Sequence, residues 1–188
     1  ILVGNSTGLW LMPRSLSGDS FDFSVPSQVM SSSNIASFGA FDIDGDFYKD
    51  VLVVNGSATN WQYTYFSGGS TLNQDSTFFA SSSDYRCNKL LIFDYDKDNI
   101  QELICYDVSN EMLRIYNRNT LIKNISEFTY LNKTLGFTPA DIFITDVDSD
   151  GEWEIGVGNS DEKNNYFYNV NESTISYHLN SSPSSDNS

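Results

Sequence analysis

The sequence has few basic residues, and this shortage limits what the protein can bind. Its 188 residues include 10 lysines and arginines against 25 aspartates and glutamates, which gives a formal net charge of −15 at pH 7. A nucleic-acid-binding protein needs a basic face to neutralise phosphates, and anionic membranes attract the same kind of face. We therefore expect neither a nucleic acid nor an anionic membrane surface as a partner.

Long apolar runs are also missing. No segment approaches the roughly 20 apolar residues that a membrane-spanning helix needs, so we expect no direct membrane insertion. The first residues, ILVGNSTGLW, lack the charged start and the cleavage pattern of a signal peptide. They resemble a strand entered midway, and we expect the sequence to be a piece of a longer or processed protein.

Cysteine is scarce as well. The sequence contains only Cys87 and Cys105, which are too few to define a disulfide framework. If both are oxidised, they can pair across neighbouring strands. Cys105, however, occupies the place that Val53 and Val157 hold in two related segments described below. This correspondence favours a small buried apolar residue at Cys105 over a disulfide partner.

Catalytic side chains are scarce as well. There is a single histidine, His178, and no Gly-x-Ser-x-Gly elbow or phosphate-cradling loop. We expect His178 to be exposed or packed on a strand, and we predict that the protein is not an enzyme. The three tryptophans, Trp10, Trp61 and Trp153, can stack on sugar rings, but packing between sheets is the favoured role.

What the sequence has instead is an internal repeat. Three segments share one pattern: FDIDGDFYKDVLVVN, FDYDKDNIQELICYD and TDVDSDGEWEIGVGN. Their first aspartates, Asp42, Asp94 and Asp146, are 52 residues apart each time (94 − 42 and 146 − 94). Such regular spacing indicates one structural unit copied three times.

Each copy predicts four short antiparallel strands, with an acidic turn between the first and the second. The first strands are ASFGAF, KLLIF and DIFIT, and the second are VLVV, LICY and IGVG. The third are WQYTYF, MLRIYN and NYFYNV, and the fourth are STFFASS, ISEFTYL and STISYHL. Ahead of these copies, ILVGN aligns with IGVGN, and WLMP and FDFSVP are expected to supply two later strands.

These patterns predict an all-β fold, a partial β-propeller of four-stranded antiparallel blades, each with an acidic hairpin loop. The expected boundaries are a partial blade of three strands over 1–33 and whole blades over 34–85, 86–137 and 138–180. Residues 181–188 have little to bury and predict a disordered tail or linker, with an O-glycosylated stalk as the alternative. Because this is less than a closed ring, we expect further blades from the same or a neighbouring chain.

The acidic turns are the candidate metal sites. Counting from the first aspartate of each turn, carboxylates occupy positions 1, 3, 5 and 9, and position 7 offers a backbone carbonyl. Oxygen-only ligands suit Ca²⁺, a crowded cage suits Mg²⁺ less, and the lack of His or Cys disfavours zinc. The predicted ligands are Asp42, Asp44, Asp46, Tyr48, Asp50; Asp94, Asp96, Asp98, Ile100, Glu102; and Asp146, Asp148, Asp150, Glu152, Glu154.

The acidic turns have two alternative interpretations besides a propeller calcium loop. An EF-hand begins with the same DxDxDG spacing, but it needs a glutamate at position 12 and flanking helices. Position 12 is Val53, Cys105 or Val157, with strands expected on both sides, so the EF-hand is excluded. Solvated acidic turns are the second alternative, and the recurrence of one pattern in three loops favours metal binding over them.

The iterated motif DxDxDGxxD[ILV] resembles the FG-GAP repeats of integrin α-subunit propellers and the related VCBS-type repeats of secreted proteins. Phe38-Gly39-Ala40 echoes the elements that name the family, and the resemblance covers residues 1 to about 180. It implies calcium in the hairpin loops of a propeller, with partner recognition by other loops. The glycine at position 6 is kept only as Gly151, while Phe47 and Asn99 replace it. Phe47 is expected to take the left-handed conformation at a cost.

The most favoured function is a calcium-stabilised extracellular or cell-surface module for adhesion, scaffolding or recognition of a protein or glycan ligand. The alternatives are a carbohydrate-binding, lectin-like propeller and an accessory domain of a polysaccharide-active enzyme. Asn-x-Ser/Thr sequences fit a secreted glycoprotein if the source is eukaryotic. They begin at Asn5, Asn55, Asn124, Asn132, Asn171 and Asn180.

Overall fold

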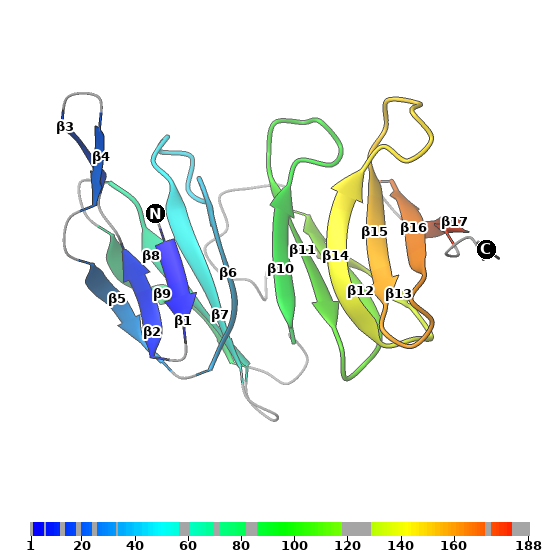
Figure 1. Cartoon of the computed structure of the whole chain (residues 1–188), viewed down its shortest axis with the longest axis horizontal. Helices are drawn as coiled ribbons and strands as arrows, with labels where there is room; N and C mark the ends of the chain where they lie inside the picture. Colours follow the sequence, from blue (N-terminus) through cyan, green and yellow to red (C-terminus); the bar gives the residue numbers. More distant parts are fainter. Residues whose placement is uncertain are drawn as a thin grey trace. The chain divides into compact units, whose positions relative to one another are not determined.

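The computed structural model describes residues 2–5, 7–11, 14–17, 20–23, 26–32, 34–56, 61–69, 72–81, 86–117, 129–171 and 174–181. These residues form strands, turns and bends, and none of them is helical. Within these ranges, no helix has the length and apolar character needed to cross a membrane. The chain divides into two compact units, Ile1–Tyr85 and Arg86–Ser188, which are described separately (Figure 1).

The first unit contains two sheets and a hairpin, all antiparallel. One sheet has the strand order β1 (Leu2–Asn5), β2 (Gly8–Leu11), β5 (Ser27–Ser31), and the hairpin is β3 (Arg14–Ser17) with β4 (Ser20–Phe23). The other sheet is β6 (Ile35–Phe41), β7 (Asp50–Gly56), β8 (Trp61–Ser67) and β9 (Asn73–Ser81) in chain order. Leu9 of β2 packs with Val51, Val53 and Phe66 in a buried cluster, so the two sheets share a core.

The second unit contains two four-stranded sheets, each with its strands in chain order. They are β10 (Lys89–Phe93), β11 (Glu102–Asp107), β12 (Met112–Asn117), β13 (Thr129–Thr134), and β14 (Pro139–Thr145), β15 (Glu154–Asn159), β16 (Asn165–Val170), β17 (Ile175–Ser181). Ile104 and Ile115 of the first sheet lie in one apolar cluster with Ile142 and Val157 of the second. The Tyr106 hydroxyl also donates to the Ala140 carbonyl across the two sheets, at 3.0 Å.

The all-β class and the antiparallel strands of the three repeats are confirmed. The described residues form no closed barrel or ring, so the blades of a propeller stay a prediction. Ser181 belongs to β17, while the rest of the expected tail, 182–188, lies outside the described residues.

One predicted strand is wrong. FDFSVP was expected to complete the first sheet, but Ser27–Ser31 does so as β5, and Ser20–Phe23 instead pairs with Arg14–Ser17. The register joins Ser17 to Ser20, which leaves only Gly18 and Asp19 between the two strands. A Gly-Asp pair between two short segments is typical of a tight hairpin, and this local signal competes with the pairing predicted for FDFSVP.

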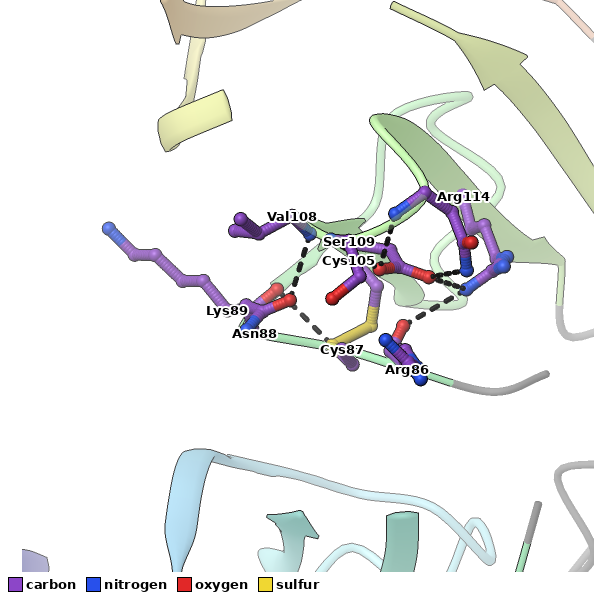
Figure 2. Close-up of polar contacts among 10 residues, drawn as sticks. Arg86, Cys87, Asn88, Lys89, Cys105, Val108, Ser109 and Arg114 are labelled. Atoms are coloured by element: carbon purple, nitrogen blue, oxygen red, sulfur yellow. Dashed lines mark hydrogen bonds and ion pairs between the residues drawn. A yellow bond between two sulfur atoms is a disulfide. The ribbon is translucent and has the colours of Figure 1, made fainter. Parts of the chain in front are cut away.

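Cys87 and Cys105 form a disulfide, so the preference for an unpaired apolar Cys105 is wrong, although the residue is buried as expected. Cys87 precedes β10, and Cys105 lies in β11 opposite Leu90. Figure 2 shows that polar contacts surround the bridge. The Asn88 side-chain oxygen accepts the Val108 N–H at 2.9 Å, and the Asn88 backbone N–H donates to the Tyr106 carbonyl at 2.8 Å. The bridge therefore belongs to a network that holds residues 86–88 on the sheet.

A buried ion pair completes this network. The Arg114 guanidinium lies 3.4 Å from the Asp107 carboxylate and donates to the Arg86 carbonyl at 3.0 Å, and both charged side chains are buried (Figure 2). Asp107 also accepts the N–H groups of Ser109 and Asn110. A buried pair whose remaining atoms are hydrogen-bonded avoids the cost of an unpaired buried charge.

Removal of the disulfide tests how much the second unit depends on it. We expect the double variant Cys87→Ala/Cys105→Val to lose about 3 kcal/mol in free energy of unfolding, because the bridge closes a loop with a sequence separation of 18. Valine at 105 preserves apolar packing, since Val53 and Val157 occupy the corresponding places. Denaturant unfolding followed by circular dichroism measures the loss. The prediction would be contradicted if the variant had the same unfolding midpoint as a parent protein whose disulfide is shown to be formed.

Candidate metal centres

Three acidic loops join the first two strands of the four-stranded sheets. The first acidic loop is 42–50, between β6 and β7; the second is 94–102, between β10 and β11; the third is 146–154, between β14 and β15. In each loop, position 1 directly follows the first strand and position 9 is the first residue of the second strand. The two ends of every loop are therefore held at the start of an antiparallel ladder.

Three carboxylates converge in each loop, from positions 1, 3 and 9. One oxygen from each of the three lies within 4.8 Å of the others. The groups are Asp42, Asp44 and Asp50; Asp94, Asp96 and Glu102; and Asp146, Asp148 and Glu154. The structure thus brings together nine of the predicted ligands, three in each loop.

The same backbone hydrogen bonds orient these carboxylates in all three loops. The position 6 N–H donates to position 1 and the position 2 N–H donates to position 9. The position 5 N–H donates to position 3. These distances are 2.9, 2.6 and 3.3 Å in the first loop, 3.0, 3.3 and 3.2 Å in the second, and 3.0, 2.8 and 3.2 Å in the third. Three sequences with different intervening residues therefore fold into one loop geometry.

The position 9 carboxylates are buried. Asp50, Glu102 and Glu154 are 0%, 2% and 1% exposed, and no lysine or arginine of the described ranges forms an ion pair with them. Burial, followed by the charge of nearby Asp96, raises the pKa of Glu102 to about 8. In the same loop, Asp94 Oδ1 is buried and has no hydrogen-bond partner among the described atoms. A buried carboxylate without a counter-charge is costly, and a cation would offset that cost.

The donor set fits a hard cation. Every converging side chain is a carboxylate, and oxygen ligands of this kind suit Ca²⁺ or Mg²⁺. The position 5 carboxylates, Asp46, Asp98 and Asp150, are not in these groups and accept the position 7 N–H at 2.9, 2.6 and 2.8 Å. Ligation by these three and by the carbonyls of Tyr48, Ile100 and Glu152 stays a prediction.

The loop backbone is left-handed at two positions. At position 6, φ is 72° for Phe47, 69° for Asn99 and 90° for Gly151, as expected from the glycine of the motif. At position 4, φ is also positive, at 80° for Gly45, 63° for Lys97 and 61° for Ser149, which the sequence analysis missed. Only Gly45 signals that requirement in the sequence, because lysine and serine are not typical of left-handed turns.

Two side chains outside the loops reach position 3. The Tyr65 hydroxyl of β8 donates to Asp44 at 3.1 Å, and burial followed by the charge of Asp50 raises the pKa of Tyr65. His178 Nε2 lies 3.3 Å from the Asp148 carboxylate. The β16–β17 register skips His178 at an irregularity, which a lone histidine in a sequence does not reveal. His178 is thus packed on a strand, as expected, but at the third acidic loop.

The glycosylation sequences lie in varied settings. Asn5 ends β1, is exposed, and its Oδ1 accepts the N–H and the hydroxyl of Thr7, both at 2.8 Å. Asn132 is exposed on β13, Asn171 is exposed after β16, and Asn55 is half-buried on β7. Asn180 is in β17, and Asn124 lies outside the described residues. Glycosylation itself stays a prediction.

Comparisons of the chain with protein-family models, with curated proteins and with solved structures find no match. The resemblance to FG-GAP and VCBS-type repeats therefore remains a prediction from the loop residues. The function has to be inferred from the three loops themselves.

The backbone at position 6 generates a prediction about stability. Phe47 is 95% exposed at φ 72°, so Phe47→Gly should raise the free energy of unfolding by about 1 kcal/mol by relieving the left-handed conformation. Gly151→Ala should lower it by a similar amount, because φ is 90° there while a Cβ would meet nothing within 4 Å. Chemical denaturation of both variants in chelator measures the two effects. Equal signs for the two variants would rule out backbone strain as the cause.

Proposed function

We propose that each acidic loop binds one Ca²⁺ and that the chain is a calcium-stabilised module of an extracellular protein. The observation that carries this proposal is the recurrence of one carboxylate geometry in three loops, at positions 1, 3 and 9 with the same hydrogen bonds. Solvated acidic turns would account for the carboxylates at positions 1 and 3, which are not fully buried. They do not explain a buried carboxylate at position 9.

Calcium is the cation that the loops favour. It accepts six to eight oxygen ligands at variable geometry, whereas Mg²⁺ demands a near-ideal octahedron and retains water. Three carboxylates from a turn, with further oxygens available at positions 5 and 7, suit the larger ion. Zinc is disfavoured because none of the three groups contains Cys or His.

The role of the ion is structural. Positions 1 and 3 lie in the turn and position 9 begins the next strand, so one ion ties the end of the first strand to the start of the second. Three bound Ca²⁺ would change the formal charge from −15 to −9 (−15 + 6), which relieves repulsion within every loop. Binding to the folded state alone stabilises it by mass action.

The extracellular setting and the propeller are part of the same proposal. A disulfide is typical of oxidising compartments, and calcium in these compartments is abundant enough to fill sites of modest affinity. Four-stranded meanders that share apolar faces are the building units of propellers, so we infer that the sheets are blades. Loops other than the acidic ones would then present a surface for adhesion, scaffolding or partner recognition.

Calcium titration tests the proposal. Calorimetry of the chelator-stripped protein should show about three equivalents of bound calcium. The melting temperature should also rise, because each site contributes about 2.7 kcal/mol to the free energy of unfolding at a calcium concentration 100 times Kd. Asp44→Asn, Asp96→Asn and Asp148→Asn should each remove about one equivalent. The control is Asp161→Asn, an exposed carboxylate outside the loops with the same change in charge. A folded sample that binds no calcium would refute the proposal.

Carbohydrate binding is a second candidate, because Tyr48, Trp153 and Tyr177 expose aromatic surface that can stack on sugar rings. A glycan array in the presence of calcium tests it. Binding of defined glycans that Tyr177→Ala reduces would support a lectin. If no glycan on the array binds, the result would contradict a lectin and favour a protein ligand.

A further inference from the structure

The second and third acidic loops are in direct contact within the second unit. Lys97, position 4 of the second loop, donates its ammonium to the Gly151 carbonyl at 2.6 Å and lies 3.1 Å from the Glu152 carboxylate. Gly151 and Glu152 are positions 6 and 7 of the third loop. Figure 1 shows both loops at the same edge of the unit, beyond the ends of β10 and β14. One side chain therefore links two candidate metal loops.

A second contact joins the same loops at their rims. The rings of Phe93 and Trp153 meet edge to face, with centroids 5.3 Å apart and planes at 82°. Phe93 directly precedes Asp94, and Trp153 directly precedes Glu154. The aromatic pair thus connects the residue before position 1 of the second loop with the residue before position 9 of the third.

The peptide that Lys97 contacts is part of the ligand scaffold of the third loop. The Gly151 N–H donates to Asp146 at 3.0 Å, and the Glu152 N–H donates to Asp150 at 2.8 Å. The Gly151 carbonyl and the Glu152 N–H belong to one peptide unit, which adjoins the Gly151 N–H, so a donor on that carbonyl restrains this unit. Restraint of that unit would act directly on the hydrogen bond to Asp150 and, through the adjoining Gly151 N–H, on the orientation of Asp146.

We propose that Lys97 is a positioning residue for the third acidic loop and that cation binding at the second and third loops is positively coupled. The inference rests on the proposed function, because it concerns the same ions. Lys97 itself has φ 63°, a left-handed conformation that lysine does not favour, so its position depends on the conformation of the second loop. A cation that orders the second loop also orders Lys97, and the third loop then binds with less conformational entropy left to lose.

Simple electrostatics does not account for this coupling. An exposed ion pair such as Lys97–Glu152 contributes little by itself. A cation in one loop also lowers the negative potential at the other, which opposes the coupling, and salt weakens this repulsion. The hydrogen bond to a neutral carbonyl and the aromatic contact are not screened in this way. We therefore expect a coupling of about fivefold in affinity, at the lower end of the usual range.

A double-mutant cycle isolates the coupling. Asp44→Asn silences the first loop in all samples, and Asp96→Asn silences the second; the affinity of the third is followed by Trp153 fluorescence and calcium calorimetry. With Lys97 present, silencing the second loop should weaken the third about fivefold. In a Lys97→Met background, the same change should have less than a twofold effect, and Lys97→Arg should restore most of the coupling because it keeps a cationic donor.

Lys163→Met is the matched control. Lys163 is exposed, has φ 57° as Lys97 has 63°, and forms no ion pair with a described residue. Both variants therefore remove one positive charge and replace a lysine whose backbone is left-handed. Coupling in Lys163→Met should equal that of the parent.

Amide exchange in chelator gives a readout that needs no ion. The Glu152 amide, whose peptide unit contains the Gly151 carbonyl, and the adjoining Gly151 amide should exchange several times faster in Lys97→Met than in Lys163→Met, because that unit has lost its restraint. Equal exchange together with unchanged coupling would overturn the inference and leave the proposed function intact. Absence of calcium binding in every folded variant would overturn the proposed function, and the coupling with it.

Discussion

Convergence of like charges at the first turn of each repeated sheet is the constraint on which the rest of the structure depends. Two antiparallel strands meet at that turn, and their ladder can begin only where three carboxylates are within 4.8 Å of one another. Backbone N–H groups hold the carboxylates in place and offset part of the repulsion. The buried position 9 residue has no cationic partner among the described residues, and a cation bound as proposed would offset the remaining repulsion. On that proposal, the shared need for a cation explains why the loops resemble each other more closely than the strands do.

The strands were largely predictable because their signal is local. MLRIYN and NYFYNV coincide with β12 and β16, and KLLIF with β10, since alternating or continuous apolar runs bounded by polar turns mark a strand directly. The convergence of positions 1 and 3 was also predictable, since alternate residues share a side. The same alternation includes position 5, but those carboxylates lie outside the groups and accept the position 7 N–H instead. The order of strands within each repeat followed from short connections, which favour neighbours in sequence as neighbours in space.

The features that were not predicted depend on contacts between distant residues or on backbone conformations that the sequence pattern does not specify. Comparison with Val53 and Val157 predicted the burial of Cys105 but not its bond to Cys87, because Cys87 precedes β10 and has no counterpart in the repeat pattern. The position of His178 depends on a single irregularity between β16 and β17. Lys97 and Ser149 at left-handed φ show the same limit, since their conformation is imposed by the loop rather than preferred by the residues.

The simple order of strands within each repeated sheet has a consequence for how the chain folds. Every pairing in these sheets joins strands adjacent in sequence, so closure of each requires only a short segment of chain. The first hairpin of each sheet is expected to close less readily, because its turn brings carboxylates together and their repulsion opposes pairing of the strands. If the loops bind calcium as proposed, the ion acts on the rate of hairpin closure as well as on the final state, and each sheet would assemble at a speed set by the calcium concentration around the emerging chain.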